Sequence, residues 1–387
     1  MALYRSHFSQ FFLVMLLFAA RLLYAQPEEE TWDELEYFQN RNEPYHIFAD
    51  SLDSREQWNQ ERLTTLVGNV RLVQGDLTLK ADKAWIYHKA ERTLLEGNVH
   101  IIDERGEITA DYGTYDRAKR FARLRGNVHA ADSVYSITSQ FATYDQPSQV
   151  AVADKQVQLT DTQNHITLTG DRLRYERTLQ YAVMTGSPKL VRHAPEDTST
   201  ITITAEKMEL FQTERKAVAT GNVVIERDEM TATCLVATYY DTDERLVLAG
   251  KPQAKQGQNE MAADEIRFFF ADRHLKRVEL QGNSQAFYLP ADSLAGEIPP
   301  STVAGDSIGI LFENDQIQQI DIAGHALSVY FPDDPDQRGN WNRSQGEHIR
   351  LLMQDGKPER IKIEGGAAGT YQFLEKGNHE RNGKSPL

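Results

Sequence analysis

Two phrases of sequence, ADKAWIY at Ala81–Tyr87 and LEGNV at Leu95–Val99, decide the fold of this chain. Both return 29 positions later (110 minus 81, and 124 minus 95), as ADYGTY at Ala110–Tyr115 and LRGNV at Leu124–Val128. A fixed period of this length is typical of stacked repeat folds, in which each repeat packs only against its neighbours. The repeat therefore predicts one elongated array, whereas the length of 387 residues alone would suggest two or three ordinary domains.

Two landmarks recur along most of the chain, a small residue followed by a second, usually polar residue, and a turn residue that is nearly always Gly. The small-polar pairs are Ala49-Asp50, Ala81-Asp82, Ala110-Asp111, Ser139-Gln140, Gly170-Asp171, Ala205-Glu206, Cys234-Leu235, Ala263-Asp264, Gly305-Asp306 and Gly346-Glu347. The turn residues are Gly68, Gly97, Gly126, Lys155, Gly186, Gly221, Gly250, Gly282, Gly324 and Gly365. The spacing between the two landmarks is 15 or 18 positions throughout, which gives about ten units.

The apolar residues alternate around each turn residue, as Leu95 and Val99 do around Gly97. Alternation with a period of two places one face of a strand inward and the other in water. Across each small-polar pair the apolar parity slips by one position, for example from Ala81 to Ala84. Because such a slip swaps the two faces of a straight strand, we expect a bulge or corner at the pair, with the acid bonding a local backbone N–H.

The segments between landmarks are rich in Val, Ile, Thr and Tyr and lack a sustained helical stripe, so they predict strands. Short polar stretches at 89–92 and 116–120 are interpreted as hairpin turns, with a short helix as the alternative. The predicted fold class is all-β, an elongated repeat solenoid of about ten stacked units.

The chain is expected to begin with a secretory signal peptide over residues 1–25, because an apolar run at Phe11–Ala20 follows a weakly basic start. An uncleaved membrane anchor is the alternative. An acidic linker is expected over 26–42, repeats over 43–290, divergent C-terminal repeats with longer loops over 291–375, and a disordered tail over 376–387. The insertions at 289–303 and 332–344 are interpreted either as a cap or docking rim or as tolerated surface loops.

The formal net charge of −15 argues against binding to nucleic acid, whose backbone is held by clustered Lys and Arg. It is compatible with a ligand held by apolar contacts. The one cysteine, Cys234, falls in an apolar column and is expected to be buried.

The sequence contains none of the common catalytic or metal-binding motifs, and we expect no enzyme activity, cofactor or metal. The recurring acids Asp82, Asp111, Asp171, Asp264 and Asp306 are interpreted as corner residues because they return in successive repeats.

The repeated phrases at 81–87, 95–99, 110–115 and 124–128 resemble the OstA-like family of periplasmic lipopolysaccharide-transport proteins, most strongly over about 45–290. The resemblance implies an open, V-shaped β-jelly-roll whose apolar interior holds acyl chains. It also implies strand addition at the open ends, to inner-membrane and outer-membrane transport components with similar domains or to further copies of the chain.

The function expected from this resemblance is transfer of lipopolysaccharide, or a related glycolipid, from the inner to the outer membrane through an apolar groove. The expected location is the periplasm, with association with the outer membrane as a further expectation. The inward columns supply the candidate lipid-binding residues, Leu66, Val70, Leu95, Val99, Ile101, Ile108, Leu124, Val128, Leu248 and Leu280. The alternatives are a closed β-helix serving adhesion or envelope structure and, more weakly, a carbohydrate-active β-helix enzyme.

Overall fold

The computed structural model describes residues 46–373 with gaps at 59, 75–76, 104–105, 133–134, 164, 194–199, 272–273, 290–298, 315, 333–338 and 355–356. The expected signal peptide, acidic linker and C-terminal tail lie outside the described residues. Every regular element within them is a β-strand, which confirms the all-β prediction. No helix in this part of the chain has the length and apolar character needed to cross a membrane.

The described residues divide into an N-terminal unit (46–228 with Thr233–Leu246) and a C-terminal unit (Glu229–Ala232 with 247–373). The first fifteen strands, all in the N-terminal unit, are β1 (His46–Phe48), β2 (Ser51–Glu56), β3 (Arg62–Gln74), β4 (Leu77–Tyr87), β5 (Arg92–Asp103), β6 (Gly106–Asp116), β7 (Phe121–Ala131), β8 (Tyr135–Asp145), β9 (Val150–Asp161), β10 (Ile166–Glu176), β11 (Tyr181–Thr185), β12 (Lys189–His193), β13 (Thr200–Thr204), β14 (Lys207–Phe211) and β15 (Lys216–Arg227). Two strands, β16 (Met230–Tyr240) and β17 (Arg245–Ala249), are divided between the two units. The remaining strands, in the C-terminal unit, are β18 (Gln253–Gln256), β19 (Asn259–Ala262), β20 (Glu265–Ala271), β21 (His274–Tyr288), β22 (Ser301–Glu313), β23 (Gln316–Tyr330), β24 (Trp341–Gln354), β25 (Lys357–Glu364) and β26 (Ala368–Gln372).

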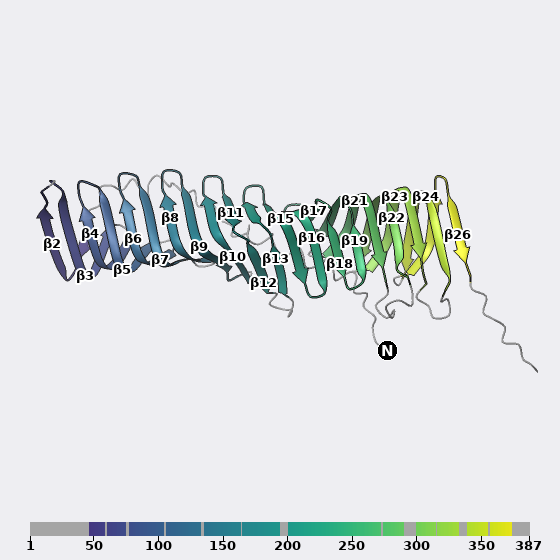
Figure 1. Cartoon of the computed structure of the whole chain (residues 1–387), viewed down its shortest axis with the longest axis horizontal. Helices are drawn as coiled ribbons and strands as arrows, with labels where there is room; N and C mark the ends of the chain where they lie inside the picture. The colour runs from purple at the N-terminus through teal and green to yellow at the C-terminus, as the bar shows by residue number, and fades with distance from the viewer. Residues whose placement is uncertain are drawn as a thin grey trace, which may run out of the picture. The chain divides into compact units, whose positions relative to one another are not determined.

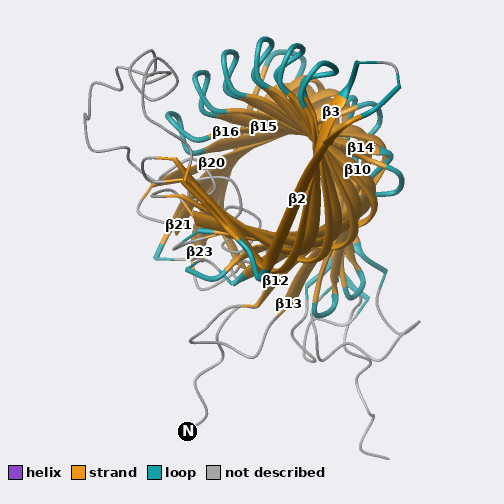
Figure 2. Cartoon of the chain, turned by 90° about the vertical axis from the view of Figure 1, so that its left-hand side faces the viewer, coloured by secondary structure: helices purple, strands orange, loops and turns teal. Residues whose placement is uncertain are grey.

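From β3 to β10 each strand pairs antiparallel with the next (Figure 1), and each of these pairs shifts register once near its middle. Between β4 and β5, for example, Lys80 pairs with His100, and the next pair is Lys83 with Glu96. The shift falls at the small-polar pair on one strand and the Gly turn on the other, as the parity slip predicts. Figure 2 shows the N-terminal unit from its β2 end, where β3 lies behind β2 and turns join the strand ends.

Each corner is made by two consecutive residues with positive φ, beginning at the predicted turn residue. All ten predicted turn residues have positive φ, including Lys155 at +65°, and so does the residue after each. Gly97 (φ +74°) shows why Gly is favoured there, because an added Cβ would lie 2.3 Å from Oδ2 of Asp82. The ten predicted units are thus confirmed as ten corners.

The acid of the small-polar pair closes the corner, but its partner differs from the one expected. Asn98 donates its Nδ2 hydrogens to the Asp82 carboxylate, with the shorter bond at 3.0 Å, instead of the carboxylate accepting a local backbone N–H. The same side-chain bond joins Asn127 to Asp111 at 3.0 Å and Asn222 to Glu206 at 2.7 Å. The Asn of the Gly-Asn pair is therefore a structural partner of the acid as well as a residue that tolerates positive φ.

At two corners a proline follows the turn and the strand ends. Pro188 and Pro252 follow Gly186 and Gly250 by two positions, at the break between β11 and β12 and at the break between β17 and β18. Proline has no N–H to give to a ladder, so the strand ends there. At Gly97 and Gly126 no proline follows and the strand continues through the corner.

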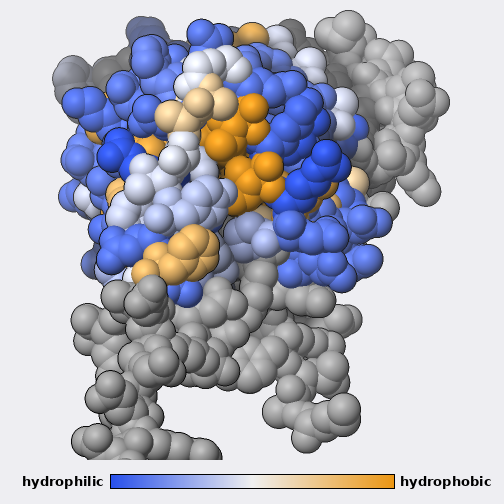
Figure 3. All heavy atoms as spheres, turned by 90° about the vertical axis from the view of Figure 1, so that its right-hand side faces the viewer, coloured by the Kyte–Doolittle hydropathy of each residue, from blue (hydrophilic) through white to orange (hydrophobic). Residues whose placement is uncertain are grey.

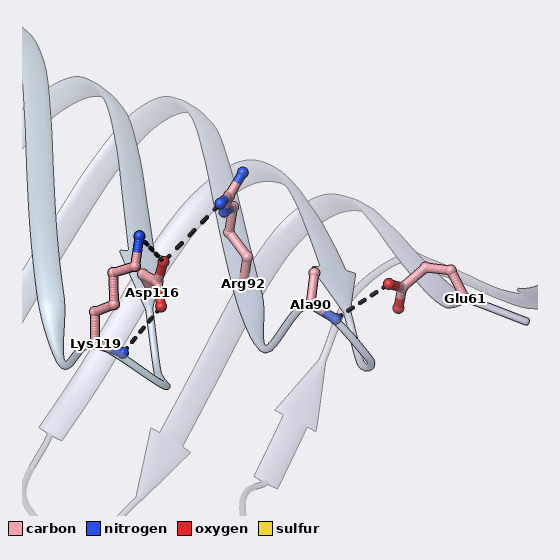
Figure 4. Close-up of polar contacts among 5 residues, drawn as sticks. All are labelled: Glu61, Ala90, Arg92, Asp116 and Lys119. Atoms are coloured by element: carbon pink, nitrogen blue, oxygen red, sulfur yellow. Dashed lines mark hydrogen bonds and ion pairs between the residues drawn. The ribbon is translucent and has the colours of Figure 1, made fainter. Parts of the chain in front are cut away.

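The turns at 88–91 and 117–120 are hairpin turns, as interpreted from the sequence, and they stack on one another. The backbone N–H of Arg117 donates to the carbonyl of Glu91 at 2.8 Å, which joins one turn to the next. The buried Glu61 accepts the N–H groups of Lys89 and Ala90 in the first of these turns, at 2.7 and 3.1 Å, and Figure 4 shows the contact with Ala90. The lateral edge is therefore a column of turns tied together by backbone and carboxylate bonds.

The insertions join the C-terminal unit at defined points. Phe331 donates its N–H to Ser301 Oγ at 3.0 Å, so the end of one insertion is tied to the residues that flank the other. Residues 290–298 and 333–338 are not among those described, and the role of the insertions stays a prediction.

Candidate functional site

The inner face of the N-terminal unit is a continuous apolar surface along the corners. Five of the predicted lining residues are at most 5% exposed and pack in one cluster, namely Leu66, Val70, Leu95, Val99 and Val128. All five stand two positions before or after a corner Gly. Beside the corners, therefore, these five side chains pack against one another and are shielded from solvent.

Three further predicted residues, Ile101, Ile108 and Leu124, pack against this cluster and are only partly buried. Ile101 and Ile108 are cross-strand partners on β5 and β6, one apolar step farther from the corner than Val99. Leu124 precedes the exposed Arg125 on β7, so adjacent residues face opposite sides as the alternation predicts. These three are the predicted residues of the N-terminal unit whose side chains are only partly buried.

A second apolar cluster on the inner face, around β9 to β11, was not singled out from the sequence. It contains the buried residues Ala153, Val157, Leu173 and Met184, with Leu159 and Leu168 packed against them. The signal was present, because Ala153 and Val157 flank Lys155 just as Leu95 and Val99 flank Gly97. The sequence therefore indicates the equivalence of this corner, although none of these residues is among the predicted lipid-binding candidates.

Leu248 and Leu280 are fully buried in the C-terminal unit. Leu280 pairs across the sheet with Ile266 on β20 and with Ile308 on β22, both of which are also buried. The C-terminal unit thus has its own apolar interior, to which two of the ten predicted residues belong.

The acidic, histidine and cysteine side chains of the described residues bear on metal binding and on corner contacts. No set of three His, Cys, Asp or Glu side chains within them is placed to hold a metal ion. The corner acids are engaged by neighbouring side chains, and in one corner His325 takes the place of Asn, with its Nδ1 3.1 Å from Asp306. Cys234 is buried as predicted, and burial raises the pKa of its thiol to about 12.

Each unit ends in an edge strand. In the N-terminal unit β2 lies outside β3, and all six of its residues are exposed (Figure 1). In the C-terminal unit β26 pairs with β24, all five of its residues are exposed, and Tyr371 stacks on Phe373 with ring centroids 6.4 Å apart. Figure 3 shows apolar side chains gathered among hydrophilic ones on this end face. An edge strand with a free hydrogen-bonding side is a template for pairing with another chain.

Comparison with known families finds a match over residues 46–181, to the family described as LptA/(LptD N-terminal domain) LPS transport protein. No curated protein matches the sequence. Among solved structures, LptH of Pseudomonas aeruginosa, the LptA homologous periplasmic component of the conserved lipopolysaccharide transport device, has 16% identity and a TM-score of 0.25, over 32% of this chain and 82% of LptH. The WD40 domain of SCAP from fission yeast has 8% identity and a TM-score of 0.13, over 86% of this chain and 91% of that domain. Both TM-scores are too low to support an inference about this chain.

Proposed function

We propose that the chain carries lipopolysaccharide, or a related glycolipid, between the inner and outer membranes, because residues 46–181 match the LptA/LptD N-terminal family of lipopolysaccharide transport proteins. Its apolar inner face would hold the acyl chains, and the protein would act in the periplasm. The single observation that carries the proposal is the inner column of apolar side chains, which continues from one corner to the next within the matched residues.

The transfer mechanism would rest on apolar affinity for the acyl chains and on their confinement to the inner face. Removing apolar surface from water is worth about 25 cal/mol per Å², and the effect has no preferred direction. Acyl chains held in this way can slide between equivalent positions, since the same residue types return at every corner. The partly buried Ile101, Ile108 and Leu124 are better placed to contact a ligand than Leu66, which is fully buried beside the Gly68 corner.

The edge strands suggest how partners would join. The exposed β2 of the N-terminal unit and the exposed β26 of the C-terminal unit each fit strand addition by a similar domain. Membrane-bound transport components with such domains, or further copies of this chain, are the proposed partners. A closed β-helix with a structural role in the envelope is the second candidate, favoured by the full burial of Leu66 and Val70 near the corners.

A pair of matched variants tests the proposal. Leu124→Asp places a charge on the inner face and Arg125→Asp places one on the outer face of the same strand. We expect Leu124→Asp to lower glycolipid delivery between membrane vesicles by at least about tenfold, because burying an unpaired carboxylate among acyl chains costs several kcal/mol. Arg125→Asp should deliver lipid at nearly the wild-type rate.

Folding is checked for both variants by circular dichroism and by the midpoint of urea unfolding. Wild-type delivery by a folded Leu124→Asp protein would contradict the proposal. No binding of glycolipid by the wild-type protein would favour the closed structural β-helix.

A further inference from the structure

One row of positions on the buried face of the C-terminal unit changes from apolar to polar from strand to strand. The row crosses adjacent strands in direct register, from Met261 through Ala286, Val303, Ser328 and Ser344 to Gly369. Cross-strand partners lie on the same face of a sheet. Met261, Ser328 and Ser344 are all at most 3% exposed, which identifies this face as the interior of the unit. The interior therefore ends in two serines and a glycine.

The two serines depart from the pattern of the repeat. Ser344 lies two positions before the small residue of its small-polar pair, and in every other unit that position is apolar, as Val303 shows. Ser328 lies four positions after its turn residue, where every preceding unit has an apolar residue, such as Ala286. Because the repeat otherwise keeps both positions apolar, the two hydroxyls are a local feature of β23 and β24.

On this face, two polar atoms of the described residues are buried without a hydrogen-bond partner. They are Oγ of Ser344 and Oδ1 of Asn342, which precedes Ser344 by two positions on β24 and so shares its face. Ser328, although it is the cross-strand partner of Ser344, does not bond that hydroxyl. Buried polar groups without partners are uncommon, because each one loses its bonds to water and gains none. A ligand that bonds these two atoms would recover that loss.

The edge strand leaves room opposite Ser344. Its partner on β26 is Gly369, whose backbone is not left-handed, so the conformation does not require glycine. An added Cβ at Gly369 would approach nothing closer than 3.7 Å, the distance to the carbonyl oxygen of Arg343 and to Cε2 of Tyr371. That distance is ordinary van der Waals contact, so an atom of a ligand fits at this position.

The chemistry of the two atoms specifies the group that would bind. Oγ of Ser344 can donate, whereas Oδ1 of Asn342 can only accept, so a single group that both accepts and donates satisfies the two. A hydroxyl group does this. Farther along β24 the interior is apolar, since Ile349 and Leu351 are 1% and 4% exposed. The fitting ligand is therefore an apolar chain that carries a hydroxyl.

We propose that Ser344 and Asn342 form a binding site for a hydroxyl group on the acyl chain of an amphiphilic ligand. This inference rests on the proposed function and adds to it a contact that selects among acyl chains. The lipid hydroxyl donates to Oδ1 of Asn342 and accepts from Oγ of Ser344. About 6.7 Å of strand separates the two residues, so one small group between their side chains can reach both.

The test compares two tritiated probes that differ by one hydroxyl, 3-hydroxymyristic acid and myristic acid. In the full chain a photoreactive amino acid replaces Tyr371, the cross-strand partner of Asn342, and the yield of adducts is measured against probe concentration. We expect the hydroxylated acid to reach half-saturation at an about fivefold lower concentration, the ratio expected for one net hydrogen bond. A second protein with the photoreactive residue at Leu124 reports on the N-terminal unit, where the two acids should bind equally.

Three variants separate the hydroxyl site from folding. Ser344→Ala should abolish the preference at position 371 and leave the half-saturating concentration of myristic acid unchanged. Its midpoint of urea unfolding should be unchanged or higher, because an unpaired buried hydroxyl is removed. Gly369→Val should fill the room opposite Ser344 and lower the yield of adducts from both acids at position 371. Ser307→Ala, beside the buried Ile308 and so on the opposite face of β22, should change neither concentration.

The two positions of the photoreactive residue keep the outcomes distinct. Equal half-saturation by the two acids at position 371, as a site that holds only water would give, would overturn the hydroxyl site. Absence of adducts there, or a preference that persists in folded Ser344→Ala, would do the same. Adducts at position 124 would then leave the proposed function standing, and no adducts at either position would overturn both.

Discussion

The corner geometry allows the loss of folding stability caused by Gly126→Ala to be estimated. Gly126 has φ +77°, and an added Cβ would lie 2.2 Å from Oδ2 of Asp111. A non-Gly residue at such a φ costs roughly 1–2 kcal/mol. Moving the carboxylate away breaks its 3.0 Å bond from Asn127, which adds about 1 kcal/mol. We therefore expect Gly126→Ala to lower the free energy of unfolding by about 2–3 kcal/mol.

A double-mutant cycle separates the two contributions. In an Asp111→Ala background the carboxylate is absent, so Gly126→Ala should cost only the backbone strain, about 1–2 kcal/mol. Gly257→Ala is a further comparison, because Gly257 also has positive φ (+56°) but an added Cβ there meets nothing within 4 Å. Urea unfolding followed by circular dichroism, with local hydrogen exchange at the β6–β7 corner, measures each change. A coupling of zero between Gly126→Ala and Asp111→Ala would refute the account of the corner.

Two titrations test the interior of the N-terminal unit. Tyr135, with its pKa raised to about 12, should contribute a phenolate signal near pH 12 and not near pH 10, measured as the absorbance difference between wild type and Tyr135→Phe. Because the raised pKa favours the neutral form, its contribution to stability should be complete below about pH 10 and lost as the pH rises through 12, and a step at pH 10 would be inconsistent with its burial. Cys234, whose thiol pKa is raised to about 12, should react with a disulfide reagent at pH 8 at least roughly 10³-fold more slowly in the folded protein than in denaturant, and fast reaction in the native state would contradict its buried position.

The repeat could be predicted from the sequence because its landmarks are local. The slip in apolar parity at Ala81-Asp82 required a corner, and Lys155 could be placed as a turn residue without being Gly, because the spacing was kept. The partner of the corner acid was missed, since Asn98 and Asp82 are 16 positions apart and meet only when the strand register is known.

The degree of burial was also beyond the sequence. Leu66, Leu95 and Leu124 hold equivalent positions before their corner glycines, yet Leu124 is only partly buried whereas the other two are closed off. Burial depends on what the facing strands supply, and the residues opposite differ from corner to corner. The pattern therefore predicts which side chains point inward, and the structure shows which of them are only partly buried.

The central claim is that the inner face of the repeat carries a glycolipid, and site-specific photo-crosslinking in cells tests it most directly. A photoreactive amino acid is placed at Leu124 in one variant and at Arg125 in another, so that the two probes differ by one residue and by the side of the strand they face. The account predicts glycolipid adducts from position 124 and none from position 125. Adducts from neither position in a folded, exported protein, or equal adducts from both, would contradict it.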